Sequence, residues 1–166
     1  MMFAVKELTR KFASPDENGL QELKRAARYL ITVPRLVMHF PWQPLGDTLT
    51  VYTDADHAGC LRTRKSTSGG VIVWNKAILK AWSRTQTLIA LSSGESELVA
   101  VTKGAAEALG IQSVLSDFGT KVNVEIHSDA TAAIGICKRQ GLGRVRHLAT
   151  ADLWVQQSPC SRAKAV

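Results

Sequence analysis

The sequence has few cysteines, and their arrangement excludes two common kinds of small protein. Its three cysteines, Cys60, Cys137 and Cys160, form no C-x-x-C pair and have no histidines at zinc-binding spacing. An odd number of widely separated cysteines predicts neither a disulfide framework nor a zinc site. We therefore expect free thiols in a reducing, intracellular compartment.

Long apolar runs are also lacking. No run approaches the roughly 20 residues that a membrane-spanning helix needs, because basic residues such as Lys24 and Arg28 interrupt the N-terminal half. Residues 1–5 are too short for the apolar core of a secretory signal. The sequence therefore predicts no membrane-spanning segment, and we expect no membrane partner.

Acidic residues are scarce relative to basic ones. The 166 residues contain 21 Lys and Arg against 14 Asp and Glu, a net charge of +7, and 45% of them are hydrophobic. This composition suits one globular core with a small appendage, and the positive charge favours a polyanion such as nucleic acid. Five of the few acids fall inside or beside patterned elements: Asp54, Asp56, Glu95, Glu97 and Asp129. A small acidic focus in a basic protein indicates metal-assisted chemistry on phosphates.

The pattern of apolar residues divides the chain into two parts. Residues 17–33 carry apolar side chains at helical spacing with basic residues on the opposite face, and Pro34 ends this predicted helix. Residues 41–47 contain proline and glycine and predict a linker. We therefore expect a domain boundary within residues 41–47.

The part after the linker predicts a mixed α/β domain. Three strands that form an antiparallel meander are expected over residues 48–53, 71–74 and 78–82. Ser92 and Ser93, followed by Glu95, are typical of a helix N-terminus, and this long helix ends near Gly119. A fourth strand over residues 122–126 and a helix over 130–138 follow, and the crossover helix makes the fourth strand parallel. Residues 158–166 predict a disordered tail.

Acidic residues stand where two of these strands end. Asp54 and Asp129 each stand at the end of a predicted strand, and Glu95 and Glu97 lie near the start of the helix between them. If the two strands are neighbours in the sheet, these acids meet at one edge. Three converging carboxylates repel one another unless divalent cations intervene, and Mg²⁺ prefers such hard oxygen ligands. The alternative is structural, because strand-end aspartates often form turns and helix-start glutamates often cap.

Several segments carry a specific family resemblance. Residues 52–60 (YTDADHAGC) and 63–69 (TRKSTSG) resemble the YSDADWAG…R-STSG signature that opens the ribonuclease H domain of copia-class retrotransposon Pol polyproteins. Residues 78–83 are similar to that family's ISWKS strand, residues 90–100 (ALSSGESELVA) to its ALSSTEAEYMA helix, and residues 127–134 to its CDNQSAI segment. The motifs occur in order and cover residues 48–139.

The resemblance implies a ribonuclease H-like mixed sheet over residues 48–157. Residues 23–30 (LKRAARYL) are similar to the helix that closes the neighbouring reverse transcriptase, so residues 1–40 are expected to be a C-terminal remnant of its thumb or connection. The implied reaction is hydrolysis of the RNA strand of an RNA–DNA hybrid with two Mg²⁺ ions, for which Mn²⁺ can substitute. The implied partners are the hybrid and the reverse transcriptase portion of the same polyprotein, in the cytoplasm, a virus-like particle or the nucleus.

Carried over residue by residue, the family's catalytic and metal-binding acids fall on Asp54, Glu97 and Asp129. Glu97 is preferred to Glu95 because two hydrophobic residues and an alanine follow it, as in the family, and Glu95 projects from a different side of the helix. Asp56 is interpreted as a loop residue. His57 replaces the family's tryptophan and is interpreted as an exposed substitution, with a proton shuttle as the alternative.

The C-terminal end departs from the family. Ala149 stands where the aspartate of a KHID motif is expected, and Asp152 is either a substitute ligand or a solvated helix residue. The family's last strand and helix, which supply a fourth acid, are expected to be missing, so the fold is predicted to be truncated. The alternatives to an active enzyme are a catalytically dead relic that binds nucleic acid and a merely structural fragment.

Basic residues near the predicted site are the candidates for nucleic-acid binding. They flank the acids in the sequence and comprise Arg62, Arg64, Lys65, Lys138, Arg139, Arg144 and Arg146. They can contact the backbone and 2′-hydroxyl groups of a hybrid without reading its sequence, and the alternative is a solvated basic surface. Trp74 and Trp82 occupy strand positions and are predicted to lie in the core.

Overall fold

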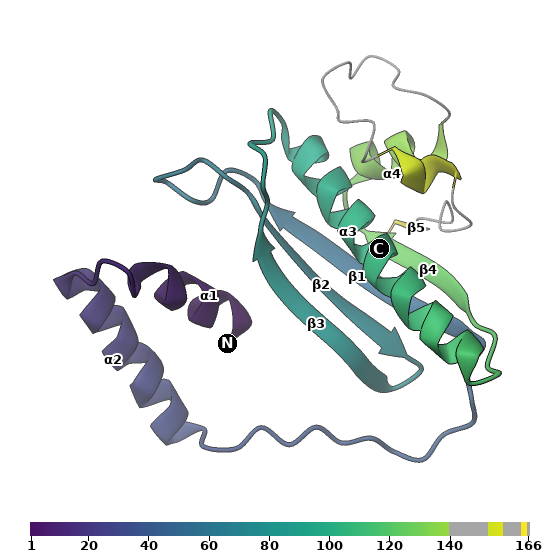
Figure 1. Ribbon diagram of the computed structural model, residues 1–166, viewed down its shortest axis with the longest axis horizontal. Coiled ribbons are helices and arrows are strands. Elements are labelled where there is room, and N and C mark those ends of the chain that lie inside the picture. Colours follow the sequence, from purple (N-terminus) through teal and green to yellow (C-terminus); the bar gives the residue numbers. More distant parts are fainter. Residues whose placement is uncertain (140–152, 158–163, 166) are drawn as a thin grey trace. The chain divides into compact units, whose positions relative to one another are not determined.

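The structure is a computed structural model that describes residues 1–139, 153–157 and 164–165 (Figure 1). The chain separates into two compact units, Met1–Phe40 and Pro41–Val166. Arg144, Arg146, Ala149 and Asp152, which the sequence analysis singled out, lie outside the described residues.

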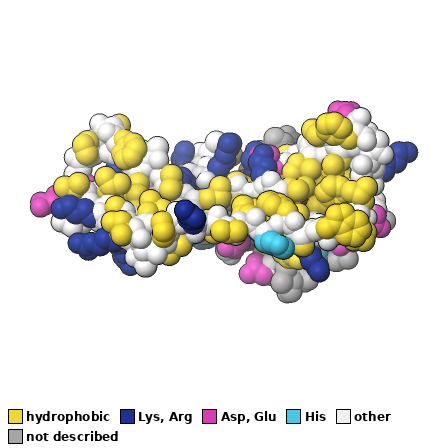
Figure 2. Space-filling model, turned by 90° about the horizontal axis from the view of Figure 1, so that it is seen from below, with side chains coloured by type: hydrophobic (Ala, Val, Ile, Leu, Met, Phe, Trp, Pro, Cys, Tyr) yellow, Lys and Arg dark blue, Asp and Glu magenta, His cyan; other side chains and the backbone are white. Residues whose placement is uncertain are grey.

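The N-terminal unit consists of two helices, α1 (Met2–Lys11) and α2 (Glu17–Thr32). The predicted helix over residues 17–33 is confirmed, and Asp16 caps it by accepting a hydrogen bond from the Gly19 N–H at 2.6 Å. Helix α1 was not predicted. Neither helix buries a residue, and exposed hydrophobic side chains lie among Lys and Arg on this unit (Figure 2).

The second unit is built on a five-stranded mixed sheet with the order β3-β2-β1-β4-β5. Its strands are β1 (Thr48–Asp56), β2 (Thr67–Trp74), β3 (Ala77–Thr85), β4 (Asn123–Ser128) and β5 (Lys164–Ala165). The first three form the predicted antiparallel meander, and β4 pairs with β1 in parallel. Asn75, whose φ is +52°, makes the tight turn from β2 to β3, a conformation that asparagine adopts more readily than most residues.

Helix α3 (Ser93–Asp117) crosses one face of the sheet and connects β3 to β4 (Figure 1). It begins as predicted, because the Ser92 side chain accepts a hydrogen bond from the Glu95 N–H at 3.3 Å. It ends just before Gly119, whose φ of +78° favours glycine. Helix α4 (Thr131–Lys138) and a short 3₁₀ helix (Trp154–Gln157) complete the described elements.

The hydrophobic core lies between α3 and the sheet. Leu49, Val51, Ile72, Leu98 and Ile126 are fully buried there, and each such side chain stabilises the fold by about 1.5–3 kcal/mol. By length and composition α3 would also qualify as a membrane span, contrary to the expectation that no apolar run is long enough. Helix α3 packs against the sheet and contributes buried residues to the core. A core helix of a globular protein can have the same length and apolar composition as a membrane span.

The strand order and pairing confirm the predicted α/β, ribonuclease H-like sheet. One part needs correction. Lys164 and Ala165, assigned to a disordered tail, form β5 and pair in parallel with His127 and Ser128. A two-residue strand therefore lies where the last strand was expected to be missing, because the open edge of β4 offers unpaired backbone groups.

Candidate metal centre

Two of the three predicted acids are placed by the parallel pairing of β1 with β4. Tyr52 lies opposite His127 in this pairing. Asp54 and Asp129 follow two residues further along each chain, and alternate residues of a strand share a face. The two carboxylates therefore lie at the same edge of the sheet. Both aspartates are exposed to solvent.

The third acid reaches this edge from the helix. Glu97 lies near the start of α3 and is only 8% exposed. Its Oε1 accepts a hydrogen bond from the backbone N–H of Ala55, one residue beyond Asp54, at 3.1 Å. Its Oε2 is buried and has no hydrogen-bond partner among the residues that the structure describes. The glutamate is therefore anchored to β1 by one oxygen, while the other oxygen is buried without compensation.

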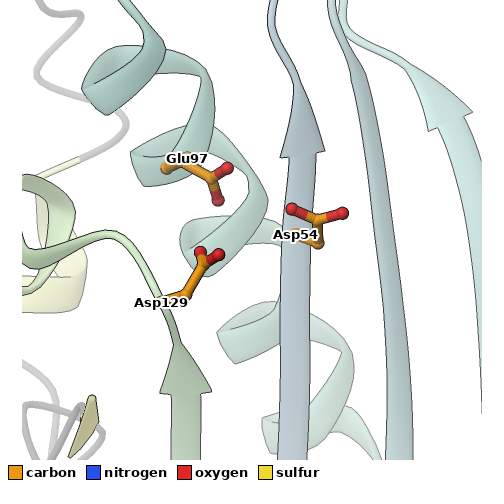
Figure 3. A group of neighbouring side chains, drawn as sticks. All are labelled: Asp54, Glu97 and Asp129. Carbon is orange, nitrogen blue, oxygen red and sulfur yellow. The ribbon is translucent and has the colours of Figure 1, made fainter. Parts of the chain in front are cut away.

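The structure brings the three predicted carboxylates together. One oxygen of each of Asp54, Glu97 and Asp129 lies within 4.8 Å of the other two. Figure 3 shows the three side chains converging from β1, α3 and the end of β4. This is the juxtaposition that the sequence predicted from strand ends and a helix start.

The electrostatics of the group centre on Glu97. Burial raises the pKa of its carboxyl from the ordinary value of 4.5 to about 7. The hydrogen bond from Ala55 opposes this rise in pKa, and the negative charges of Asp54 and Asp129 add to it. A buried carboxylate beside two others is unfavourable in its ionised form unless a cation offsets the charge.

These residues fit a divalent metal ion. They offer three hard carboxylate oxygen donors, and the partnerless Glu97 Oε2 is a buried acceptor that a cation would satisfy. Mg²⁺ commonly binds to a few such carboxylates and keeps several water molecules. The arrangement can therefore hold a cation that remains accessible to a phosphate group.

The neighbouring acids and His57 have other surroundings. Glu95 is buried, and its Oε2 accepts a hydrogen bond from the Leu91 N–H at 2.5 Å, which helps to fix the start of α3. Asp56 was interpreted as a loop residue, but it is the last residue of β1. Its side chain is exposed. His57 is exposed, as predicted.

The basic candidates lie on two segments. Arg62 and Arg64 are exposed and Lys65 is half-buried in the loop between β1 and β2, which follows the strand that carries Asp54. Lys138 is exposed at the end of α4, and Arg139 beside it is half-buried.

The β1–β2 loop is held in shape by hydrogen bonds that backbone N–H groups donate. The Ala58 N–H donates to Ser66 Oγ at 3.0 Å, and the Arg64 N–H donates to the Cys60 carbonyl at 2.6 Å. Both Ala58 and Arg64 have positive φ angles, of 53° and 55°. The loop thus has a defined conformation that presents its arginines to solvent.

Both tryptophans belong to the core side of the sheet, as predicted. Trp82 is 7% exposed, and Trp74 packs against the core while its Nε1–H donates to the Gly46 carbonyl at 2.9 Å. Sequence reasoning missed Gln86, a buried polar residue after β3 that hydrogen-bonds to the start of α3. The only sequence signal was its place between a strand end and a helix cap.

Comparison with known proteins finds transposon relatives. No protein-family model matches the chain. It is 30% identical over 152 residues to the retrovirus-related Pol polyprotein from transposon RE1 of Arabidopsis thaliana, a match that covers 89% of this chain and 10% of that polyprotein. It is 28% identical over 108 residues to the polyprotein from transposon TNT 1-94 of Nicotiana tabacum, covering 64% and 8%. The chain thus spans about a tenth of the length of these relatives.

Other comparisons give two further similarities. A Plasmopara viticola protein named secreted RxLR effector protein 161 is 34% identical over 106 residues, which cover 64% of this chain and 74% of that protein. Among solved structures, LC11-RNase H1, isolated from compost by a metagenomic approach, aligns with a TM-score of 0.48 and 16% identity, covering 73% of this chain and 84% of that one. The chain is thus similar in sequence to retrovirus-related Pol polyproteins of transposons, and its strand order is the one predicted for a ribonuclease H-like domain.

Proposed function

We propose that this chain is a metal-dependent endonuclease that hydrolyses the RNA strand of RNA–DNA hybrids with two Mg²⁺ ions. The observation that carries the proposal is the buried, partnerless Oε2 of Glu97 within a group of three carboxylates. A purely structural glutamate would have both oxygens satisfied, because an unpaired buried acceptor is costly. The relationship to transposon Pol polyproteins supports the same activity.

The three acids have different roles in this proposal. Asp54 and Asp129, which are exposed at the sheet edge, would hold the metal ions where a phosphate can reach them. Glu97 would hold one ion with Oε2 and orient the 2′-hydroxyl or the attacking water, while its Oε1 stays on the Ala55 N–H. Bound Mg²⁺ ions would activate water and stabilise the leaving oxygen, so that cleavage leaves a 3′-hydroxyl.

Substrate binding would depend on the basic segments. Arg62 and Arg64 in the β1–β2 loop and Lys138 at the end of α4 are exposed and can contact backbone phosphates. Such contacts carry no sequence information and weaken as salt rises. We place the activity beside the reverse transcriptase portion of such a polyprotein, in the cytoplasm or a virus-like particle.

The test is cleavage of an end-labelled RNA–DNA hybrid by the purified chain in the presence and absence of Mg²⁺. Asp54→Asn is the matched variant, because it keeps the size of the side chain and removes its charge. Cleavage that needs Mg²⁺ and is lost in Asp54→Asn supports the enzyme. Binding of the hybrid by a folded chain without cleavage contradicts the proposal and favours the relic.

A further inference from the structure

Gln86 is a polar residue buried at a junction of three elements. It follows β3 directly and is 7% exposed. Its backbone N–H donates to the Ser66 carbonyl at 2.8 Å. Its side-chain Nε2 donates to Ser68 Oγ at 2.9 Å and to the Ser96 carbonyl at 2.8 Å. One amide group therefore joins the beginning of β2 to the beginning of α3.

The partners of Gln86 lead directly to the metal centre. Ser68 in β2 lies opposite Ala55 in β1, and the Ala55 N–H is the donor that holds Glu97 Oε1. Ser96 is the residue before Glu97 in α3. The sheet and the helix are thus joined twice at the same level, once by Gln86 through Ser96 and once by Glu97 through Ala55.

The Ser96 carbonyl at this junction requires a hydrogen-bond donor, and the Gln86 amide supplies it. A backbone carbonyl can only accept a hydrogen bond, so a side chain that bonds to the Ser96 carbonyl must present an N–H or O–H donor. Ser96 is fully buried and Ser68 is 3% exposed, so water does not reach them readily as a substitute donor. A side chain without a donor at this position removes the hydrogen bond that joins the start of α3 to Gln86 and β2.

We infer that Gln86 is the positioning residue for Glu97. By holding the Ser96 carbonyl against β2, it keeps Glu97 Oε1 on the Ala55 N–H and Oε2 beside Asp54 and Asp129. Gln86 does not touch the three carboxylates in this scheme and acts through the backbone of α3. Its effect on metal affinity rests on the proposed function, whereas its effect on the bond between Glu97 and Ala55 does not.

The test compares Gln86→Met with Gln112→Met in the full chain. Methionine keeps the approximate length of glutamine and removes the amide. Gln112 also lies in α3, and its Nε2 donates to the Val122 carbonyl at 2.6 Å, in the second half of the helix. The control therefore removes the same kind of hydrogen bond from the same helix outside the metal centre.

The first readout is hydrogen exchange of the Ala55 amide, measured by NMR without metal. Protection of that amide reports its bond to Glu97. We expect exchange at Ala55 to be about tenfold faster or more in Gln86→Met and unchanged in Gln112→Met, as suits a coupling through direct contacts. Unchanged exchange at Ala55 in a folded Gln86→Met chain, or equal acceleration in both variants, would overturn the inference.

The second readout is Mg²⁺ affinity by calorimetry. Loss of a positioning partner weakens metal binding by about 10–100-fold, and we expect this only in Gln86→Met. If the parent chain binds no Mg²⁺, the proposed function fails while the Ala55 exchange still decides the role of Gln86. If Gln86→Met does not fold, Gln86→Asn replaces it, because asparagine keeps the amide but is too short to reach both partners.

Discussion

Replacing the buried glutamate of the metal centre should stabilise the metal-free chain at neutral and alkaline pH. Glu97→Gln keeps the acceptor for the Ala55 N–H and removes a charge that is buried beside two other carboxylates. The pKa of Glu97 is about 7 against its ordinary value of 4.5, a difference that corresponds to about 3 kcal/mol. The free energy of unfolding of the parent chain falls by at most this amount when Glu97 is ionised.

The sign of the pH dependence follows from proton binding. Between pH 4.5 and about 7 the folded state binds more protons at Glu97 than the unfolded state does. The contribution of this group to stability is therefore fully present below pH 4.5 and is lost as pH rises to about 7. Glu97→Gln removes this loss. The free energy of unfolding of the variant should therefore exceed that of the parent by a growing amount as pH rises from 4.5 to about 7.

The assay is urea denaturation of both chains with EDTA at pH 4.5, 6 and 8. We expect similar free energies of unfolding at the lowest pH and a variant more stable by about 2–3 kcal/mol at pH 8. With saturating Mg²⁺ the order should reverse, because the parent gains stability by binding metal. A parent that equals or exceeds the variant at pH 8 without metal would refute the account of Glu97.

Three further predictions concern metal binding, packing and an ion pair. At pH 6, Mg²⁺ binding should release about one proton, because Glu97 is largely protonated in the metal-free chain. Calorimetry in buffers of different ionisation enthalpy measures the number of protons released. Binding without proton release would contradict this prediction. Gly104→Ala should destabilise by about 1–3 kcal/mol, because a Cβ would lie 2.5 Å from Thr53 Cγ2. Gly110→Ala in the same helix has open space and should stabilise by about 0.5–1 kcal/mol in thermal unfolding; equal effects would contradict the packing. Glu107→Gln should cost no more than about 1 kcal/mol, because its lysine partners are more than a third exposed. The lysines lower the pKa of Glu107 to about 2. The difference in free energy of unfolding between parent and variant should therefore be present above pH 4.5 and fade as pH falls towards 2. It should also shrink in high salt, and a salt-independent difference would count against the ion pair.

Much of the second unit was predictable from local patterns. Strand alternation, the Ser92 cap and the exit at Gly119 each depend on a few neighbouring residues, and the structure has them. Helix α1 escaped prediction because its ten residues make fewer than three turns, so few apolar positions mark its period. Strand β5 escaped because two residues show no periodicity, and it depends on the open edge of β4.

The candidate site shows the same division. Asp129 was predictable because it follows a strand and Asp54 because it lies near the end of one. The choice of Glu97 over Glu95 depended on the family resemblance and on helix geometry. The partnerless Glu97 oxygen and the contacts of Gln86 were not predictable. Gln86 meets partners 10 and 18 residues away, and such pairings arise only when β2 and α3 pack together.

The most direct test of the central claim is anomalous scattering from crystals of the chain soaked in Mn²⁺. We predict anomalous density between the carboxylates of Asp54, Glu97 and Asp129, with Glu97 Oε2 among the ligands. The density should be absent from crystals of Asp54→Asn treated in the same way. Crystals of the parent chain that bind Mn²⁺ elsewhere, with no density at this edge of the sheet, would contradict the account.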